Sequence, residues 1–248
     1  LKNMPVTLIG VAIASAVFPK FSQRVAEHRT DLLKLQVVRT TQVMLWLLLP
    51  TAALFVVMRG YIVRLLFGFG DPTTASILGW FAGAIIFQSL MRIVARVFYA
   101  EQDTRTPLYT SMIALTINVP LAITLTNFYG IRGLAMAQSL VAILEVSLLY
   151  TLMRRRFGRF FNWQFAAHLA KTLLATSAAA LAAYLMVRYP FPLVAGETGF
   201  TSLAPKFFAI GSVGAVAYIA TGWLLKLPEA TTVTSRIGRV IFKRLQIQ

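Results

Sequence analysis

The stretch FYAEQDTRTPLYT, residues 98–110, separates two long apolar segments of this 248-residue chain. Five polar residues in a row, Glu101 to Arg105, interrupt the apolar sequence, which resumes directly after Thr106 and Pro107. Proline suits the first turn of a helix, because its ring fixes φ and the first backbone N–H groups have no partner within the helix. The stretch therefore predicts a polar hairpin between two membrane-spanning helices, with Pro107 in the first turn of the second.

The composition is that of a membrane protein. Of the residues, 58% are hydrophobic and only 13% are charged. The apolar residues fall in runs of about 20, the length that a helix rising 1.5 Å per residue needs to cross roughly 30 Å of hydrocarbon. We therefore predict an all-α fold, a polytopic membrane helix bundle of about seven transmembrane helices. The predicted spans are residues 4–19, 41–58, 75–98, 107–126, 132–153, 167–188 and 205–225.

Two further segments carry apolar residues without forming a full span. Residues 20–40 place apolar side chains among charges, a pattern typical of an amphipathic stretch that lies on the membrane surface. Residues 61–69 (YIVRLLFGF) are apolar but too short to cross the bilayer, so they are predicted to lie in the interface.

The basic residues set the predicted orientation. The chain has 24 Lys and Arg against 8 Asp and Glu, but most of the basic residues fall in short loops and not on one soluble face, which argues against nucleic-acid binding. Alternate loops divide these residues unequally, with 16 on one side and 6 on the other. Cytoplasmic loops are enriched in Lys and Arg, so the richer side is predicted to be cytoplasmic, and the C-terminus with it. The richer set consists of residues 20–41, 96–106, 153–166 and 226–248.

The sequence lacks the clusters of residues that usually bind metals or cofactors. The chain has no cysteine and only two histidines, His28 and His168, which are far apart, so no cofactor and no metal site is predicted. An enzyme acting on polyprenyl phosphates would need clustered acids or histidines near the interface, and the acids here are scattered. The opening LKNMPVTLIG has neither an initiator Met nor a basic n-region, so the chain is expected to be a piece of a longer protein.

Three motifs carry a resemblance to a known family. They are LIGVAIASAVFPKFS (8–22), ARVFYAEQDTRTP (95–107) and FYGIRGLAMAQSL (128–140). In order and spacing they resemble the C-terminal half of the MurJ (MviN) lipid II flippases, members of the MOP superfamily of transporters. The resemblance covers about residues 1–156, and the last two helices match only in position and hydrophobicity.

The resemblance implies a protein of about fourteen helices, with two pseudo-symmetric lobes around a cationic cavity. Such a protein flips lipid-linked peptidoglycan precursor, lipid II, across the bacterial inner membrane by alternating access. Residues 1–156 would form the C-terminal lobe, incomplete at its N-terminus, residues 157–225 an additional helix pair, and residues 226–248 a basic cytoplasmic tail. The expected partners are the lipid-linked oligosaccharide substrate, anionic phospholipids and an N-terminal lobe on the same or a separate chain.

The hairpin motif contains its own candidate residues. Asp103, Thr104 and Thr106 all supply oxygens that can cap the helix in which Pro107 lies. We expect Asp103, Arg105 and Pro107 to define a motif on the cytoplasmic face.

Three polar residues recur at intervals of four in the span 75–98, so Gln88, Arg92 and Arg96 share one helix face. A charge is costly in hydrocarbon, so these side chains should face protein, water or headgroups. We expect Arg92 to face the cavity and to pair with a diphosphate, which suits a planar guanidinium, and the family also tends to carry a basic residue there. Arg96 is expected either beside it or extended to phospholipid headgroups.

Glu145 is the only acid in any predicted span, and Gln138 lies two turns earlier on the same face. An unpaired carboxylate at that depth would be protonated or costly. Two interpretations stay open, a structural ion pair and a coupling site for H⁺ or Na⁺. Arg92 is the expected partner in at least one conformation.

Transport is the leading hypothesis for function, as the C-terminal part of a lipid II flippase and not as an enzyme. The alternatives are an exporter of another polyprenyl-linked glycan or of a drug, and a truncated or split membrane scaffold protein.

Overall fold

The computed structural model describes residue 4 and residues 6–68, 70–193 and 199–231, and all the regular elements within these ranges are helical. Within these described ranges, seven helical stretches are long and apolar enough to cross a membrane, counting η1 with α2 as one. The predicted number of spans is therefore confirmed. The elements are η1 (Val6–Val11), α2 (Ala12–Ala26), α3 (Thr30–Val57), α4 (Arg59–Phe67), α5 (Pro72–Ala100), α6 (Arg105–Tyr129), α7 (Ile131–Phe157), α8 (Trp163–Arg188) and α9 (Phe200–Leu224).

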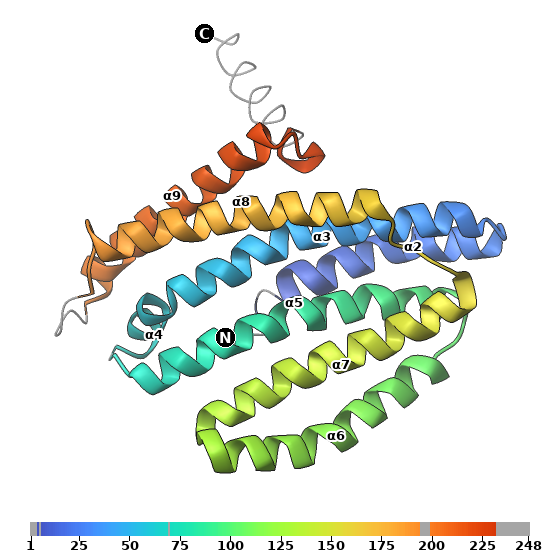
Figure 1. Cartoon of the computed structure of the whole chain (residues 1–248), viewed down its shortest axis with the longest axis horizontal. Helices are drawn as coiled ribbons and strands as arrows, with labels where there is room; N and C mark the ends of the chain where they lie inside the picture. Colours follow the sequence, from blue (N-terminus) through green and yellow to red (C-terminus); the bar gives the residue numbers. More distant parts are fainter. Residues whose placement is uncertain (1–3, 5, 69, 194–198, 232–248) are drawn as a thin grey trace, which may run out of the picture.

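The long helices lie side by side in one broad arrangement (Figure 1). Helix α5 lies at its centre, with α3 and α2 packed on one side and α7 on the other. Helix α6 packs almost entirely on α7 and forms one edge, while α8 covers α3 and carries α9. The core that joins α2, α3, α5 and α7 includes the fully buried side chains of Phe21, Met44, Ile93 and Leu149.

The edge helix α6 shows how the sequence suits a bilayer. Most of its large apolar side chains are exposed, Leu115 at 66% and Ile123 at 59%, a surface that water would disfavour and lipid accommodates. A tight connection holds this helix against α7. A Cβ at Gly133 would lie only 2.1 Å from the carbonyl oxygen of Leu125, so only glycine permits this approach.

The prediction of a surface-lying stretch at residues 20–40 is wrong. Its first residues complete α2, a tight turn with His28 at φ 52° follows, and Thr30 begins a continuous helix α3. Three apolar side chains of the stretch are buried against neighbouring helices, with Phe21 fully buried and Leu33 and Val37 1% exposed, while Leu35 is 47% exposed. The amphipathic pattern therefore reflects helix packing beyond the span and not contact with a membrane surface.

The short segment 61–69 falls largely within α4, a helix of nine residues, and residue 69 lies outside the described residues. Tyr61, Ile62 and Val63 are buried, and the Tyr61 hydroxyl donates a hydrogen bond to the Phe191 carbonyl. Whether α4 lies in the membrane interface stays a prediction.

Of the predicted tail 226–248, the structure describes residues 226–231. Leu227 and Ala230 are buried in a cluster with Trp46 of α3 and Tyr218 of α9, so the beginning of the tail packs on the helices. The remainder of the tail, 232–248, lies outside the described residues.

Candidate functional site

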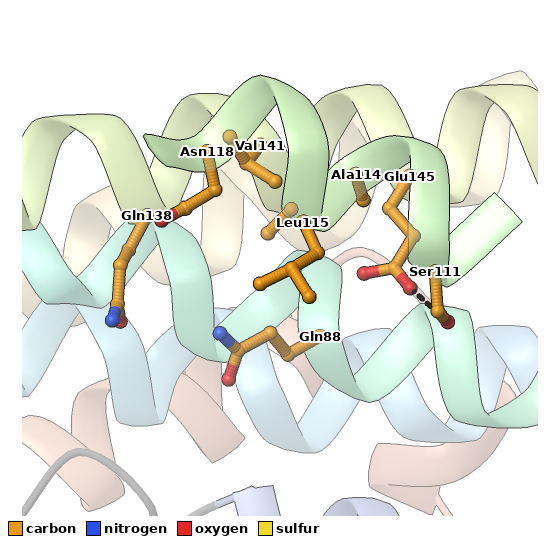
Figure 2. Close-up of a pocket in the computed structure, with 9 residues that line it drawn as sticks. Gln88, Ser111, Ala114, Leu115, Asn118, Gln138, Val141 and Glu145 are labelled. Atoms are coloured by element: carbon orange, nitrogen blue, oxygen red, sulfur yellow. Dashed lines mark hydrogen bonds between the residues drawn. The ribbon is translucent and has the colours of Figure 1, made fainter. Parts of the chain in front are cut away.

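A polar cavity of about 540 Å³ lies among α5, α6 and α7 (Figure 2). Three of the residues predicted from the sequence line it, namely Gln88 from α5 and Gln138 and Glu145 from α7. The structure adds Ser111 and Asn118 from α6, which sequence reasoning missed. Small polar residues in an apolar helix are common, and only the pairing of α6 with α7 shows that these two face the same space.

Glu145 finds its partner across this cavity. The Ser111 hydroxyl donates a hydrogen bond of 2.7 Å to Glu145 Oε1, which links α6 to α7 (Figure 2). Gln138 Oε1 is buried and accepts no hydrogen bond from the described protein groups. A buried amide oxygen without a donor costs about 1–3 kcal/mol. The Gln138 oxygen is therefore available to accept a hydrogen bond from a further group in the cavity.

The two arginines of α5 occupy different surroundings. Arg96 extends to α2, where its Nη2 lies 3.4 Å from Ser15 Oγ and its guanidinium 5.3 Å from the centre of the Phe18 ring. Arg92 is exposed. Within the described ranges neither guanidinium has a carboxylate within 4.0 Å, and the Arg92–Glu145 contact stays a prediction for another conformation.

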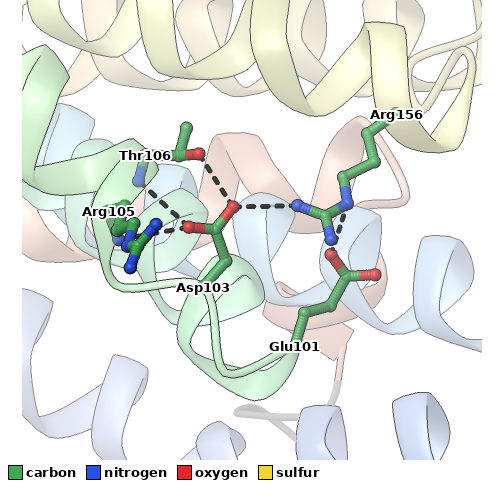
Figure 3. A network of polar contacts seen from close by, with 5 residues as sticks. All are labelled: Glu101, Asp103, Arg105, Thr106 and Arg156. Atoms are coloured by element: carbon green, nitrogen blue, oxygen red, sulfur yellow. Dashed lines mark hydrogen bonds and ion pairs between the residues drawn. The ribbon is translucent and has the colours of Figure 1, made fainter.

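The hairpin between α5 and α6 carries a separate network of hydrogen bonds and ion pairs (Figure 3). Asp103 caps α6, since its Oδ1 accepts hydrogen bonds from the backbone N–H groups of Arg105 and Thr106, at 3.1 and 3.0 Å. The guanidinium of Arg156, in the last turn of α7, bridges Asp103 Oδ2 at 2.8 Å and Glu101 Oε2 at 2.7 Å. Three residues, Asp103, Thr104 and Thr106, were predicted as possible caps. Asp103 is the one whose carboxylate accepts hydrogen bonds from the backbone N–H groups at the start of α6.

The two carboxyl groups that contact Arg156 have pKa values shifted in opposite directions. Hydrogen bonds from Thr106, together with Arg156, lower the pKa of Asp103. Burial raises the pKa of Glu101, and the attraction of Arg156 does not compensate fully. Glu101 Oε2 lies close to Arg156 Nε yet lacks hydrogen-bond geometry, which agrees with the weaker stabilisation of its charge.

Pro107 lies in the first turn of α6, as predicted. Its side chain is buried, and the Arg105 side chain is exposed. The sequence placed Arg156 only among the basic residues of the predicted cytoplasmic loop 153–166, because it gives no sign that α7 ends beside this hairpin.

A second polar pair, less exposed than the first, joins α8 to the beginning of the tail. His168 Nε2 lies 3.0 Å from Glu229 Oε2, and the two side chains are 10% and 12% exposed. Burial disfavours the charge of Glu229 most strongly, but the hydrogen bond and the charge of His168, together with a backbone hydrogen bond, outweigh it and lower the pKa of this carboxyl group. No three His, Cys, Asp or Glu residues within the described ranges form a group that could hold a metal ion.

Comparison with known proteins shows which family this chain resembles. The model of the family described as "Lipid II flippase MurJ" matches residues 1–198. Among curated proteins, one named "Probable lipid II flippase MurJ" from Thermotoga maritima is 24% identical over 95% of this chain and 46% of its own length. Proteins of the same name from Vibrio cholerae and Borreliella burgdorferi are 29% and 25% identical over 60% and 62% of the chain.

The fold has a solved counterpart as well. The structure titled "Lipid II flippase MurJ, inward closed conformation" superposes with a TM-score of 0.67, at 18% identity, over 88% of this chain and 44% of its own chain. Over the curated matches described above, the chain covers from 30% to 46% of the relative's length. The helical elements and this structural match confirm the predicted fold class, an all-α, polytopic helix bundle.

Proposed function

The chain belongs to the lipid II flippase MurJ family, and on that premise we propose that it forms part of a transporter that flips lipid II from the cytoplasmic to the outer leaflet. It is a multi-pass protein of the bacterial inner membrane, by its seven spans and its family. The family is one of transporters and not of enzymes. The substrate expected from the family is a lipid-linked precursor, and alternating access is the mechanism that a two-lobed protein of this kind would use.

The observation that carries this proposal is the pair of arginines on α5. Arg92 and Arg96 lack a carboxylate partner within the described ranges, although a charge in or near a membrane span is costly without a partner. A diphosphate would supply that partner, because a guanidinium presents several N–H donors in the geometry that phosphate oxygens accept. We assign Arg92 to direct diphosphate contact and Arg96 to a supporting position against α2.

The polar cavity among α5, α6 and α7 would then belong to the same substrate-facing surface. Gln88 lies one turn from Arg92 on α5 and lines the cavity that also contains Glu145 and Gln138. We propose that these side chains face the transport pathway. The Ser111–Glu145 hydrogen bond would hold α6 and α7 together while the arginines engage the substrate.

The remaining parts follow the same proposal. Residues 1–156 form part of the C-terminal lobe, residues 157–225 an additional helix pair and residues 226–248 a basic tail in the cytoplasm. The N-terminal lobe and anionic phospholipids are the proposed partners. Labelling of single cysteines introduced at positions 103 and 129 tests the orientation, since position 103 should react only from the cytoplasm and position 129 only from outside.

Substitution of Arg92 in the whole protein tests the proposed function. Loss of charge-assisted hydrogen bonds, worth about 1.5–3 kcal/mol, should lower lipid II translocation in Arg92→Ala roughly 10-fold to 100-fold. Arg92→Lys should retain part of the activity, because it keeps the charge without the planar donors. Arg132→Ala, which removes an exposed arginine near the start of α7, is the matched control and should leave translocation unchanged. Full activity of Arg92→Ala in reconstituted vesicles would refute the assigned role.

A further inference from the structure

A second cavity, of about 380 Å³, lies between α7 and α8 and differs from the first in its lining. Helices α3 and α5 form its floor, with Leu45 and Leu90, and Leu169 of α8 faces it from the side. Its lining is almost entirely apolar, and the hydroxyl of Thr41 is satisfied by the Val37 carbonyl at 2.8 Å. Such a space offers water no partners, so it favours a hydrocarbon occupant.

The cavity is open at its side. Leu173 of α8 is 48% exposed and Ser147 of α7 is also exposed, and both lie on its lining. Helices α7 and α8 both belong to the candidate membrane spans, so this opening would face lipid chains. The cavity also lies between residues 1–156 and the helix pair that follows them, and an occupant would therefore fill a gap between those two parts.

One end of the cavity is aromatic, and two basic residues, Lys34 and Arg154, lie outside its lining but within one turn of the lining residues Val37 and Tyr150. Phe161 stacks on Tyr150 with ring centres 5.1 Å apart and on Phe165 at 4.1 Å. Arg154 follows Tyr150 by one turn on α7, so the two residues lie on the same face of this helix. Lys34 Nζ lies 3.5 Å from the position that a Cβ would take at Gly158. Neither cation forms an ion pair with a described carboxylate, so this end of the cavity has positive charge to offer.

We infer that this cavity binds one acyl chain of an anionic phospholipid, whose headgroup phosphate lies against Lys34 and Arg154. The apolar lining matches the chain, and the two cations select a negative headgroup over a neutral one. Because the basic end is the predicted cytoplasmic end, the lipid comes from the inner leaflet. It would act as a structural lipid between the lobe and the α8–α9 pair.

Lipid binding to the full-length protein tests this inference. We expect native mass spectrometry to detect one phosphatidylglycerol that survives at detergent concentrations that remove phosphatidylcholine. Phosphatidylglycerol with a photoreactive acyl chain should label peptides that contain Tyr150 or Phe161 in the unsubstituted protein. Labelling elsewhere, with none on these peptides, would overturn the proposal without recourse to any variant.

Two substitutions on adjacent residues separate filling of the cavity from general damage. Leu173→Trp places an indole in the cavity and should reduce phosphatidylglycerol binding at least 10-fold. Leu174→Trp changes the next residue, which is 59% exposed and not part of the lining, and should leave binding unchanged. Equal binding by the two variants would overturn the proposal, as would equal loss by both.

The headgroup preference has its own test. Lys34→Gln and Arg154→Gln should each weaken phosphatidylglycerol about fivefold without changing the binding of phosphatidylcholine. Undecaprenyl phosphate at the same concentration should not displace phosphatidylglycerol. Preferential binding of undecaprenyl phosphate, abolished by Leu173→Trp, would assign the cavity to the carrier lipid and reject the phospholipid.

Discussion

The two polar regions of α5, α6 and α7 differ in how completely their charges are paired. At the hairpin, Arg156 contacts both Glu101 and Asp103, and Asp103 also caps α6. Along the spans, Arg92 lacks a carboxylate partner among the described residues and Gln138 Oε1 lacks a donor. The hairpin thus uses its charges to fix three helix ends, whereas the span region keeps polar groups available.

This difference separates structural from functional polar groups. A network whose charges are paired specifies the geometry of the elements that it joins. An unsatisfied group at membrane depth costs stability, and such groups are typical of ligand pathways. Substitutions at the hairpin should therefore change stability first, and substitutions on the α5 face should change transport first.

The largest expected effect concerns residues 1–248 by themselves. The α5 face needs the other lobe to enclose a pathway, so vesicles containing only these residues should show no lipid II translocation above protein-free vesicles. The whole protein in the same vesicles is the control. Clear translocation by residues 1–248 would show that the unpaired face does not depend on another lobe.

Asp103→Ala should give the largest loss of stability. It removes a helix cap, typically worth about 1 kcal/mol, and one contact of a partly exposed ion pair, worth about 0–1 kcal/mol. Thermal unfolding in detergent should show the decrease. Thr104→Ala is the matched control, because Thr104 occupies the formal N-cap position without a side-chain hydrogen bond to the helix. Equal destabilisation by both variants would contradict the assignment of the cap to Asp103.

The sequence was sufficient for much of the fold. Apolar runs of span length predicted all seven membrane helices, and Pro107 correctly predicted a helix start near residue 105. The stretch 20–40 was misinterpreted, because burial of Phe21 and Leu33 against other helices gives the same periodicity as burial in a membrane surface. Periodicity identifies the apolar face of a helix and not the material that covers it.

Less of the candidate site could be predicted from the sequence. Spacing by four placed Gln88 and Arg92 on one face, and the structure brings Gln88 to the same cavity as Glu145. Ser111 and Arg156 could not be predicted as partners, because their contacts span 34 and 53 residues of chain. Such contacts depend on which helices are neighbours, and single-helix patterns carry no information about that.

A smaller effect is expected from coupling between Arg92 and Glu145. If they meet in another conformation, Arg92→Ala leaves the carboxylate unpaired, and adding Glu145→Gln should recover part of the lost membrane abundance and activity. The expected coupling energy in a double-mutant cycle is about 0.5–1 kcal/mol. Replacing Arg92→Ala by Arg96→Ala in the cycle provides the control, since Arg96 contacts α2. Strictly additive effects of Arg92→Ala and Glu145→Gln would exclude the contact.

The smallest effect concerns the two carboxyl groups that share Arg156. The pKa of Asp103 is lowered, so its contribution is present above its unfolded pKa of about 3.9 and is lost as the pH falls through the folded value. The pKa of Glu101 is raised by burial, so its charge costs stability at neutral pH, and this cost disappears as the pH falls below its unfolded value of about 4.3.

These opposite signs give a test within one hairpin. At pH 7, Glu101→Gln should unfold at the same temperature as the unsubstituted protein or slightly above it, whereas Asp103→Asn should unfold at a lower temperature. The Glu101→Gln difference should disappear as the pH falls below about 4.3, because Glu101 is then neutral like its amide replacement. The Asp103→Asn difference should only begin to shrink below about pH 3.9, because the lowered pKa of Asp103 keeps its carboxylate charged in the folded protein at lower pH. The measurement is thermal unfolding in detergent between pH 7 and pH 3.5. A loss of stability in Glu101→Gln as large as that in Asp103→Asn would mean that both carboxylates stabilise the hairpin equally, and that burial does not set the behaviour of Glu101.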